Sequence, residues 1–571
     1  MYLGINAYSH DSSACLIDAR GKIIAAVEEE RFTGKKHDSS FPVNSIKYCL
    51  SEAKISSLDL KGIGYAWHPR EMFFKRIIKE YLFEYPATWP AFKNSLRKLW
   101  HSFFIKRDFE KYIGKLNSDA VLRYYNHHTA HVASAFYASG FEEATFFTLD
   151  GRGEYQTGIS GKMNYEKGID LMGSIHHPNS LGNLWCAVSE YCGFKPGWHK
   201  AGTTMAFASL GKPIYMDKFE QIVNFYPEKK NDWLKMDTKY FDNRDGVGHI
   251  KPEFETLFGE KSCEHGMDKQ VHRDVAATLQ SFTEKVIVEK LNEVYLQTKI
   301  PRLVMAGGVC LNSVANALVL EKTPFKEMFI QPASHDAGLC IGSAYLLQQE
   351  FSKQNKPEPM VNAYFGPEFS DEDIESELVK ENSRVDFLKV NDISLGVANL
   401  IQEGNIVAWF QGRMEYGPRA LGSRSILASA SKKEMIDKLN KVKHRESFRP
   451  FAISILEDRK NEWLVKGYKS PFMLIVEAIK PNLKDIVPAA QHVDGSVRTQ
   501  TVNERDNGLY YNLLKNYYDI SKIPLFINTS FNIKGKPIVL SPKDGIEAFL
   551  DSEIDYLAIG PYLVNKKNVV I

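Results

Sequence analysis

The sequence has few cysteines, no long apolar run and almost no excess charge. Its seven cysteines are scattered, with no CxxC pair, which argues against a disulfide framework or a zinc ribbon and favours reduced thiols. No apolar run approaches the roughly 18–20 residues of a membrane-spanning helix. The first residues lack both the basic and the apolar region of a secretory leader. We therefore expect a cytoplasmic protein without a membrane span.

The charge balance gives no sign of a polyanionic partner. The chain has 72 Lys and Arg against 70 Asp and Glu, a net charge of +2, so no bulk charge draws it to nucleic acid. We therefore expect no nucleic-acid partner. Apolar residues make up 44% and charged residues 25%, which is ordinary globular composition. The length suits about two to four domains.

Alternating strand and helix patterns indicate the α/β class. Short apolar segments between turn residues predict strands over 2–6, 13–17 and 23–27. Farther along, the patterns predict a helix over 127–139, strands over 145–149 and 156–160, a long helix over 274–296 and strands over 302–305 and 327–331. A strand pair with an Asp and glycines occurs near residue 10 and again near residue 150, which suggests two similar halves.

A polar segment divides the chain. Residues 355–371 contain Pro357, Pro359 and Pro367, and we interpret them as a linker. After this linker the alternation restarts, with helices predicted over 394–403 and 433–442 and strands over 406–411 and 452–456. We therefore predict two α/β domains, residues 1–355 and 370–571.

Three histidines lie within the five positions 127–131. His127 and His131 are one helical turn apart and project from the same face. Neutral imidazoles so placed can share a divalent ion, although such a pair is also common as polar surface histidines. Carboxylates from elsewhere would have to complete the site. Asp150 and Asp336 are candidates, because each follows an apolar strand and precedes a glycine within two residues; iron, manganese or zinc suit such ligands.

Three strand ends carry Gly, Asp or Asn, at residues 4–11, 150–153 and 306–312. Turns of this kind expose backbone N–H groups that can hold phosphate, although each alone is more often an ordinary turn. Gly307 and Gly308 would let the backbone come close to a nucleotide. The order of these turns resembles the ATPase architecture shared by actin, heat-shock chaperones and sugar kinases.

At the level of motifs the chain resembles the O-carbamoyltransferase family, the NodU/CmcH group, over essentially its whole length. The matching segments follow the family's order: residues 4–13, residues 28–37, HHTAH at 127–131, LDGRGE at 149–154, AGGVCLN at 306–312, GRMEYGPRALGSRS at 412–425, FRPFA at 448–452, RTQTV at 498–502 and NTSFN at 528–532. Jointly these motifs are highly specific, although none is so alone.

The resemblance implies an actin-like, sugar-kinase-type ATPase fold for the N-terminal carbamoyl-transfer domain and a YrdC-like C-terminal α/β domain. The implied reaction uses ATP and carbamoyl phosphate to make carbamoyl adenylate. The carbamoyl group then passes to a hydroxyl of a small-molecule natural product or sugar. The resemblance also implies Fe²⁺ as the metal, and Mg²⁺ could accompany ATP. Holding several anionic oxygens requires arginines and backbone N–H donors.

The resemblance also assigns residue roles. His10 would be the base that takes the proton of the acceptor hydroxyl, and Asp11 would either orient it or cap a turn. The implied metal ligands are His127, His131, Asp150 and Asp336. The implied nucleotide contacts are Lys36, Gly307, Gly308 and Asn312. The residues implied to hold carbamoyl phosphate or the adenylate are Arg419, Lys443, Arg449, Arg498, Asn528 and Ser530. Lys438, Lys441 and Arg445 are instead expected on a solvated helix face.

Residues 66–107 are unusually aromatic and basic. This composition fits a helix at a membrane surface or a nucleic-acid patch. It also fits an amphipathic helical insertion that packs on the domain with its basic residues facing water, and this is the interpretation we favour. A role in acceptor choice or in a subunit interface stays open.

Three alternatives compete with O-carbamoyl transfer. A hydrogenase-maturation carbamoyltransferase would carry CxxC zinc fingers ahead of these domains, and this chain has no CxxC. A tRNA threonylcarbamoyl module would need a basic RNA face, which the balanced charge does not support. A nonenzymatic nucleotide-binding protein would not need His10 beside a metal site. The identity of the acceptor, the metal and the oligomeric state, including a homo-oligomer, stay open.

Overall fold

The structure, a computed structural model, describes residues 1–262, 269–352 and 356–567. The chain divides into two compact units. Unit 1 comprises Met1–Glu29 and Ser39–Met360, and unit 2 comprises Glu30–Asp38 and Val361–Ile571. The linear division predicted from the sequence placed residues 30–38 in the first domain, whereas the structure groups them with the second.

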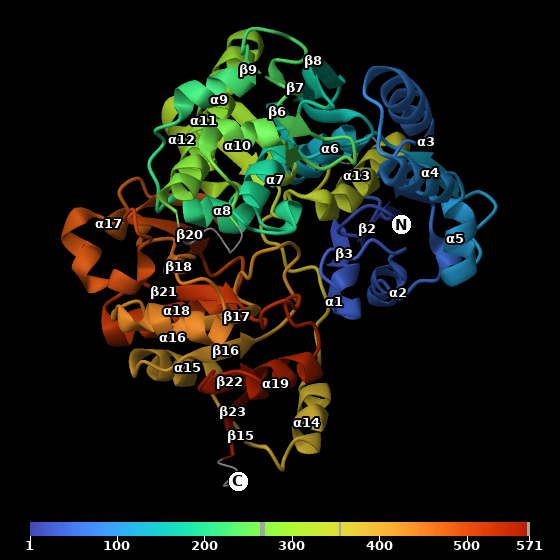
Figure 1. Cartoon of the computed structure of the whole chain (residues 1–571). Coiled ribbons are helices and arrows are strands. Elements are labelled where there is room, and N and C mark those ends of the chain that lie inside the picture. Colours follow the sequence, from blue (N-terminus) through green and yellow to red (C-terminus); the bar gives the residue numbers. More distant parts are fainter. Residues whose placement is uncertain (263–268, 353–355, 568–571) are drawn as a thin grey trace. The chain divides into compact units, whose positions relative to one another are not determined.

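The first sheet of unit 1 is built from the N-terminal strands (Figure 1). Within the described residues its order is β3-β2-β1-β4-β5. These strands are β1 (Tyr2–Asn6), β2 (Ser13–Ile17), β3 (Ile23–Glu28), β4 (Gly62–Tyr65) and β5 (Val121–Tyr124). β1 pairs antiparallel with β2 and parallel with β4, and β2 and β3 form an antiparallel hairpin.

The second sheet of unit 1 repeats this topology. Its order is β14-β13-β6-β7-β8 in the described part of the chain. The strands are β6 (Glu143–Leu149), β7 (Gln156–Asn164), β8 (Gly168–His176), β13 (Arg302–Ala306) and β14 (Glu327–Ile330). β6 pairs antiparallel with β7 and parallel with β13. The two halves suspected from the sequence are therefore present, and unit 1 has the duplicated sheet of the actin-like ATPase architecture.

Two helices carry the core between these sheets. α6 (His127–Ser139) packs on β6 and β13, α13 (Leu339–Phe351) packs on β1, β2 and β4, and the two helices pack on each other. Both are buried on nearly every side, because each has a sheet on one face and the other helix on another. The other helices of unit 1 include α2 (Val43–Glu52), α7 (Leu181–Tyr191), α8 (Ala201–Ala208), α9 (Met216–Ile222), α10 (Pro252–Phe258), α11 (Gln270–Thr298) and α12 (Ser313–Lys322).

The aromatic and basic segment forms helices between β4 and β5. They are α3 (Pro69–Glu71), the π-helix η2 (Met72–Glu84), α4 (Trp89–Phe103) and α5 (Ile105–Tyr112). Their inner residues, among them Met72, Ile77, Tyr81, Leu99 and Phe109, join the core under the first sheet. These helices therefore pack on the domain, as the favoured interpretation expected, but their water-facing side also carries large apolar side chains.

Unit 2 contains one large mixed sheet. Its order within the described residues is β15-β23-β22-β16-β17-β21-β18-β20-β19. The strands are β15 (Val385–Lys389), β16 (Val407–Phe410), β17 (Arg424–Ala428), β18 (Ala452–Leu456), β19 (Ile475–Ala478), β20 (Ser496–Val502), β21 (Leu525–Ser530), β22 (Tyr556–Ile559) and β23 (Tyr562–Lys566). The α/β class predicted for both halves of the chain is therefore confirmed.

Helices cover both faces of this sheet. α15 (Ile393–Gln402) and α18 (Gly508–Ser521) pack on each other, with Val397 and Leu513 in a core shared with Trp409. The larger core on the other face includes Leu439 and Phe549 from α16 (Glu434–Lys443) and α19 (Pro542–Leu550), whose neighbour is α14 (Asp371–Lys380).

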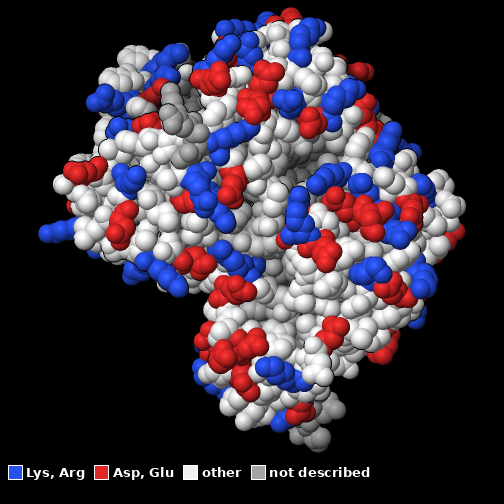
Figure 2. Space-filling model, turned by 180° about the vertical axis from the view of Figure 1, so that it is seen from behind, with Lys and Arg blue, Asp and Glu red and all other residues white. Residues whose placement is uncertain are grey.

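The surface and the cysteines agree with the composition. On the face drawn in Figure 2, basic and acidic side chains are interspersed, without a large field of one sign. Six cysteines are free and buried, and the seventh, Cys263, lies outside the described residues. No helix among the described residues is both long and apolar enough to cross a membrane.

Candidate functional site

The first turn of α6 places two histidines in the interior of unit 1. Asn126 caps this helix, because its Oδ1 accepts hydrogen bonds from the backbone N–H groups of His128 and Thr129. His127 and His131 follow one turn apart on the same face, and both are fully buried. They are therefore not the surface pair that the spacing alone also allowed.

Two carboxylates reach the same point from other elements. Asp150 follows β6 directly, and its Oδ1 accepts a 2.6 Å hydrogen bond from the N–H of Gly151. Asp336 opens a short 3-10 turn, η5 (Asp336–Gly338), that leads into α13. Both carboxylates are buried.

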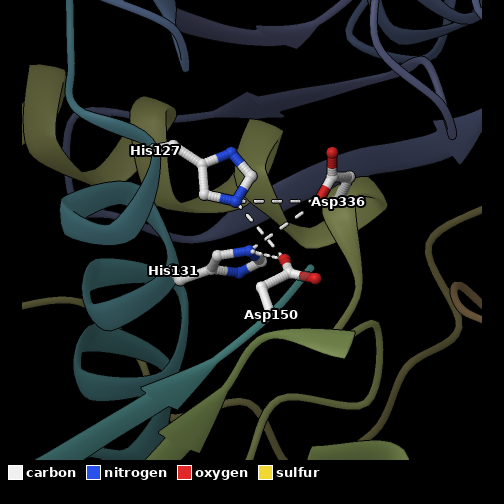
Figure 3. Close-up of side chains that lie close together, drawn as sticks. All are labelled: His127, His131, Asp150 and Asp336. Carbon is white, nitrogen blue, oxygen red and sulfur yellow. Dashed lines mark hydrogen bonds and ion pairs between the residues drawn. The ribbon is translucent and has the colours of Figure 1, made fainter. Parts of the chain in front are cut away.

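The four side chains converge (Figure 3). Asp150 Oδ2 lies 3.3 Å from His127 Nε2 and 3.0 Å from His131 Nε2. Asp336 Oδ1 lies 3.8 Å from His127 Nε2 and 3.9 Å from His131 Nε2. One ligand atom from each of the four residues lies within 4.8 Å of the others.

These separations fit one metal ion. An ion about 2.1 Å from each ligand atom holds adjacent ligand atoms about 3.0–3.4 Å apart and opposite ones about 4.2 Å apart. The observed distances of 3.0 to 3.9 Å fall in that range. Two imidazoles and two carboxylates are also the donor set that iron, manganese and zinc accept.

The electrostatics of the cluster favour a bound cation. Burial lowers the pKa of His127 to about 4, so its imidazole is neutral and free to act as a ligand. Burial raises the pKa of Asp336 well above its usual range, and Asp150 raises it further. Although burial also raises the pKa of Asp150, its hydrogen bonds with His127 and His131 hold it well below that range. Asp336 thus keeps a proton unless a cation takes its place.

His10 and Asp11 lie next to this cluster. His10 Nδ1 is 2.7 Å from Asp11 Oδ2, so Asp11 orients the ring as one of the two predicted roles requires. His10 Nε2 is 3.6 Å from Asp336 Oδ2. Burial lowers the pKa of His10, but Asp336, Asp11 and Asp150 outweigh it and raise the pKa to about 10. A divalent cation at the carboxylates would oppose this rise.

Glu154 is a functional candidate that sequence reasoning missed. Its buried carboxylate accepts hydrogen bonds from the backbone N–H groups of His68, at 2.8 Å, and His127, at 3.1 Å. It also accepts one from Asn126 Nδ2 at 3.0 Å. Glu154 therefore fixes the start of α6 and the position of His127. The LDGRGE motif contained this residue, but nothing in its spacing showed that it returns to the histidine helix.

The glycine turn after β13 lies against the Asp150 loop. A side chain at Gly307, where φ is +98°, would come 2.2 Å from the carbonyl oxygen of Leu149. A side chain at Gly308 would come 3.2 Å from Asp150 Oδ1. The glycines thus permit close packing beside the cluster.

The predicted nucleotide contacts come from both units. Asn312 caps α12 through Ala315 N and exchanges two hydrogen bonds with the Gln280 amide. Lys36 belongs to unit 2, whereas Gly307, Gly308 and Asn312 belong to unit 1. The charge of Lys36 acts on Lys443, whose pKa it helps to lower.

In unit 2 two of the predicted ligands, Arg498 and Asn528, share one face of the sheet. Ala452 pairs with Arg498 on one side and with Asn528 on the other, so both side chains project to the same face. Asn528 Nδ2 donates to Ser454 Oγ at 3.0 Å and to Ala420 O at 3.3 Å, which ties the Arg419 turn to this row. Its Oδ1 is buried without a hydrogen-bond partner among the described residues.

Lys443, the last residue of α16, reaches the end of β21, the strand that carries Asn528. Its Nζ donates to the backbone oxygens of Ser530, at 2.6 Å, and Asn532, at 2.7 Å. Nζ also lies 3.4 Å from Ser530 Oγ. Lys443 is thereby held in place although its side chain is buried.

The arginines repel one another electrostatically. Burial and Arg449 lower the pKa of Arg419 to about 10 and that of Arg445 to about 9. Burial, followed by Arg419, Arg445 and Arg449, lowers the pKa of Arg498 well below its usual range. Glu446 opposes this effect at Arg449 and Arg445. These four arginines with Lys443 are the cationic cluster of unit 2.

One correction concerns a neighbouring basic residue, and two other arginines bind backbone. Arg445 is not on a solvated helix face; its Nη2 donates to Arg449 O at 3.0 Å, and its guanidinium lies 3.9 Å from the Phe451 ring centre. Arg424, in the GRMEYGPRALGSRS motif, is fully buried and donates to backbone oxygens of Gln411, Gly412 and Pro367. Arg413 likewise binds Phe365 O and Gly366 O. Lys438 and Lys441 are exposed, as expected.

Two family models together match most of the chain. Residues 1–345 match a family model described as carbamoyltransferase N-terminus, and residues 398–566 match one described as carbamoyltransferase C-terminus.

Several curated proteins are similar over nearly the same length. The uncharacterised protein sll1178 of Synechocystis is 36% identical over 99% of this chain and 96% of its own. Nodulation protein NolNO of Sinorhizobium fredii is 32% identical over 98% of this chain and 80% of its own. Nodulation protein NolO of Bradyrhizobium diazoefficiens is 34% identical over 77% of this chain and 79% of its own.

Proposed function

Because this chain belongs to the carbamoyltransferase family, we propose that it is an ATP-dependent O-carbamoyltransferase that works through carbamoyl adenylate. Membership of the family makes it a transferase whose substrates are a carbamoyl donor and an acceptor. The finer proposal is that unit 2 forms the adenylate from carbamoyl phosphate and ATP. Unit 1 then passes the carbamoyl group to a hydroxyl of a small natural product or sugar.

The observation that carries this proposal is the cationic cluster of unit 2. After burial, the charge of Arg449 is a shared cause that lowers the pKa of Arg419, of Arg498 and of Lys443. Gathering such charges is unfavourable unless an anion offsets them. Carbamoyl phosphate, ATP and carbamoyl adenylate each present several anionic oxygens, and guanidinium groups bind these in a bidentate manner. Asn528 and Ser530 would complete the polar surface.

Adenylate formation would proceed in two steps. Water splits carbamoyl phosphate into carbamate and phosphate, and a carbamate oxygen attacks the α-phosphorus of ATP. Pyrophosphate leaves, and carbamoyl adenylate remains. Negative charge accumulates on the α-phosphate and on the leaving pyrophosphate, and fixed cations such as Arg419 and Arg449 would stabilise it. Mg²⁺ can accompany the ATP phosphates.

The transfer step would use the residues of unit 1. His10 would accept the proton of the acceptor hydroxyl at Nε2, while Asp11 holds Nδ1. The hydroxyl oxygen would bond to the carbamoyl carbon, and AMP would leave. His127, His131, Asp150 and Asp336 fit a divalent metal, Fe²⁺ by the family resemblance. Such an ion would supply positive charge to the adenylate phosphate.

The four residues proposed to contact the nucleotide lie in different surroundings. Gly307 and Gly308 lie beside Asp150, where backbone can approach a phosphate. Asn312 would have to exchange its bond with Gln280 for one with the nucleotide. Lys36 would act in unit 2, where its charge already reaches Lys443.

One assay tests the proposal. The full-length protein is incubated with ATP and carbamoyl phosphate, and pyrophosphate, AMP and ADP are quantified with and without a panel of alcohols and sugars. We expect pyrophosphate that depends on carbamoyl phosphate, and AMP release with carbamoylated product when a suitable acceptor is present. Formation of ADP in place of pyrophosphate would exclude the adenylate route.

A further inference from the structure

The outward face of α4 is apolar, which reverses the usual arrangement of a surface helix. Trp89, Leu96, Trp100 and Phe103 recur at helical spacing, and the two tryptophan side chains are 71% and 56% exposed. The buried face of the same helix carries the small residues Ala91, Ser95 and Ser102 together with Leu99. Large aromatic side chains therefore face solvent while small ones face the protein.

The neighbouring π-helix continues this apolar surface. In η2 the exposed large apolar side chains are Phe73, Phe74, Leu82 and Phe83, and Phe83 is 77% exposed. Phe73 and Phe74 lie at the start of η2, and Leu82 and Phe83 lie near its end. η2 packs against α4, where the rings of Tyr81 and Phe92 are 6.4 Å apart. We call the exposed apolar residues of η2 and α4 the outer stripe.

Basic side chains accompany the outer stripe. Six are exposed on η2, α4 and α5: Lys79, Lys93, Arg97, Lys106, Arg107 and Lys111. Lys93 and Arg97 fall within the stripe on α4 and form no ion pair in the described part of the chain. The Arg107 guanidinium lies 4.9 Å from the ring centre of Phe104, which is also exposed. Glu110 is the exposed acidic residue on α5, and it faces Lys106 at 4.0 Å.

We propose that the outer stripe docks on an anionic lipid surface. Tryptophan and phenylalanine bury their rings at the boundary of headgroups and acyl chains, while lysine and arginine reach anionic headgroups. A second copy of this chain, paired about a two-fold axis through the stripe, would bring Lys93 and Arg97 near like charges, which is unfavourable. Single-stranded nucleic acid needs a groove with stacking platforms, whereas the stripe includes Leu82 and Leu96, which offer no ring.

The other side of η2 is bonded to the candidate site. Arg76 donates to Glu154 O at 2.6 Å and also to Gly153 O. Glu80 accepts a 2.5 Å hydrogen bond from Arg152. η2 thus has the outer stripe on one side and the loop that follows Asp150 on the other. The docking proposal itself does not depend on the proposed enzymatic function.

The tryptophans provide a direct probe. Trp89 and Trp100 are the exposed ones among the tryptophan side chains that the structure describes. The full-length protein is mixed with vesicles of phosphatidylcholine alone or with about a third phosphatidylglycerol, some carrying brominated acyl chains. We expect co-flotation with the anionic vesicles only, and quenching of tryptophan emission by the brominated lipid. Absence of flotation and of quenching at low salt would overturn the proposal.

Paired variants distinguish docking through the outer stripe from a nonspecific effect of net charge. Lys93→Glu/Arg97→Glu removes two attractive charges, each worth a factor of about five, so the partition coefficient should fall at least about 30-fold. Lys167→Glu/Lys212→Glu reverses two exposed charges elsewhere in unit 1 and should change the partition coefficient little. Trp89→Ser/Trp100→Ser should abolish the quenching, and circular dichroism checks its fold.

Three further outcomes would contradict lipid docking. Equal loss of binding in both charge variants would mean that net charge alone drives binding. Sedimentation showing that wild type self-associates and that Trp100→Ser is monomeric, without vesicle binding by either, would assign the stripe to a second copy. Tight binding of single-stranded RNA in place of vesicles would assign it to nucleic acid.

Discussion

His10 Nε2 lies 3.6 Å from Asp336 Oδ2, and the other oxygen of this carboxylate faces His127 and His131. Asp336 therefore links the candidate base to the candidate metal ligands. A cation bound at His127 and His131 would therefore contact the same carboxylate that faces His10.

Loss of a histidine ligand should remove the metal. We expect the protein expressed with iron to carry about one divalent ion per chain. His131→Ala should retain less than about a tenth of it, because an ion with three remaining ligands binds far more weakly. Elemental analysis measures the content, and His176→Ala, an imidazole outside the cluster, is the control. Wild-type metal content in His131→Ala would rule out the site.

The cationic cluster should govern the first half-reaction. Arg419→Ala removes a charge-assisted contact worth about 1.5–3 kcal/mol, so pyrophosphate release should fall about 10- to 100-fold. Lys438→Ala, which removes an exposed charge on α16, should behave like wild type. Equal rates for the two variants would place adenylate formation away from Arg419. The rate is followed with a coupled pyrophosphate assay in the absence of acceptor.

His10 should matter only for transfer. His10→Ala should leave pyrophosphate release near the wild-type rate, while acceptor carbamoylation falls about 10²- to 10⁴-fold, the usual contribution of a general base. Asp11→Asn should reduce transfer in the same direction but by less, because the ring keeps a partner. Both products are quantified by mass spectrometry. Unchanged transfer by His10→Ala would exclude it as the base.

Glu154 should make stability depend on pH. Burial raises its pKa from 4.5 to about 7 in the folded protein, so the folded state binds more protons than the unfolded state between these values. The free energy of unfolding should therefore fall as pH rises across that window. Glu154→Gln should lose this part of the dependence, whereas Glu166→Gln, at an exposed position, should keep it. Urea titrations of metal-free protein at pH 5 and pH 7.5 measure it, and parallel curves for wild type and Glu154→Gln would contradict the assignment.

Local features of the structure followed from the sequence. The helix predicted over 127–139 coincides with α6, because Asn126 supplies a cap and Gly140 a left-handed end. The strand hairpins near residues 10 and 150 were readable from alternating apolar segments and turn residues. The long helix begins and ends a few residues beyond its predicted limits, at Gln270 and Thr298. Such features depend on backbone preferences and side-chain spacing within a short window, which the sequence contains directly.

The four candidate metal ligands were named from the sequence, but their geometry required the tertiary structure. Asp150 and Asp336 meet because β6 and β13 are neighbours in one sheet and η5 leads into α13, which packs on α6. The return of Glu154 to His127, the packing of Arg445 on Phe451 and the grouping of Lys36 with unit 2 likewise depend on which elements pack together.

The exposure of the outer stripe also could not be predicted from the sequence. The sequence of 66–107 revealed aromatic and basic residues, which we interpreted as an amphipathic helical insertion with its basic residues facing water. It could not show that an aromatic face points to solvent, because periodicity identifies a face without saying what covers it. Only packing decided this: the small residues Ala91 and Ser95 allow α4 to approach the protein closely, so the aromatic face of the helix is the one left exposed.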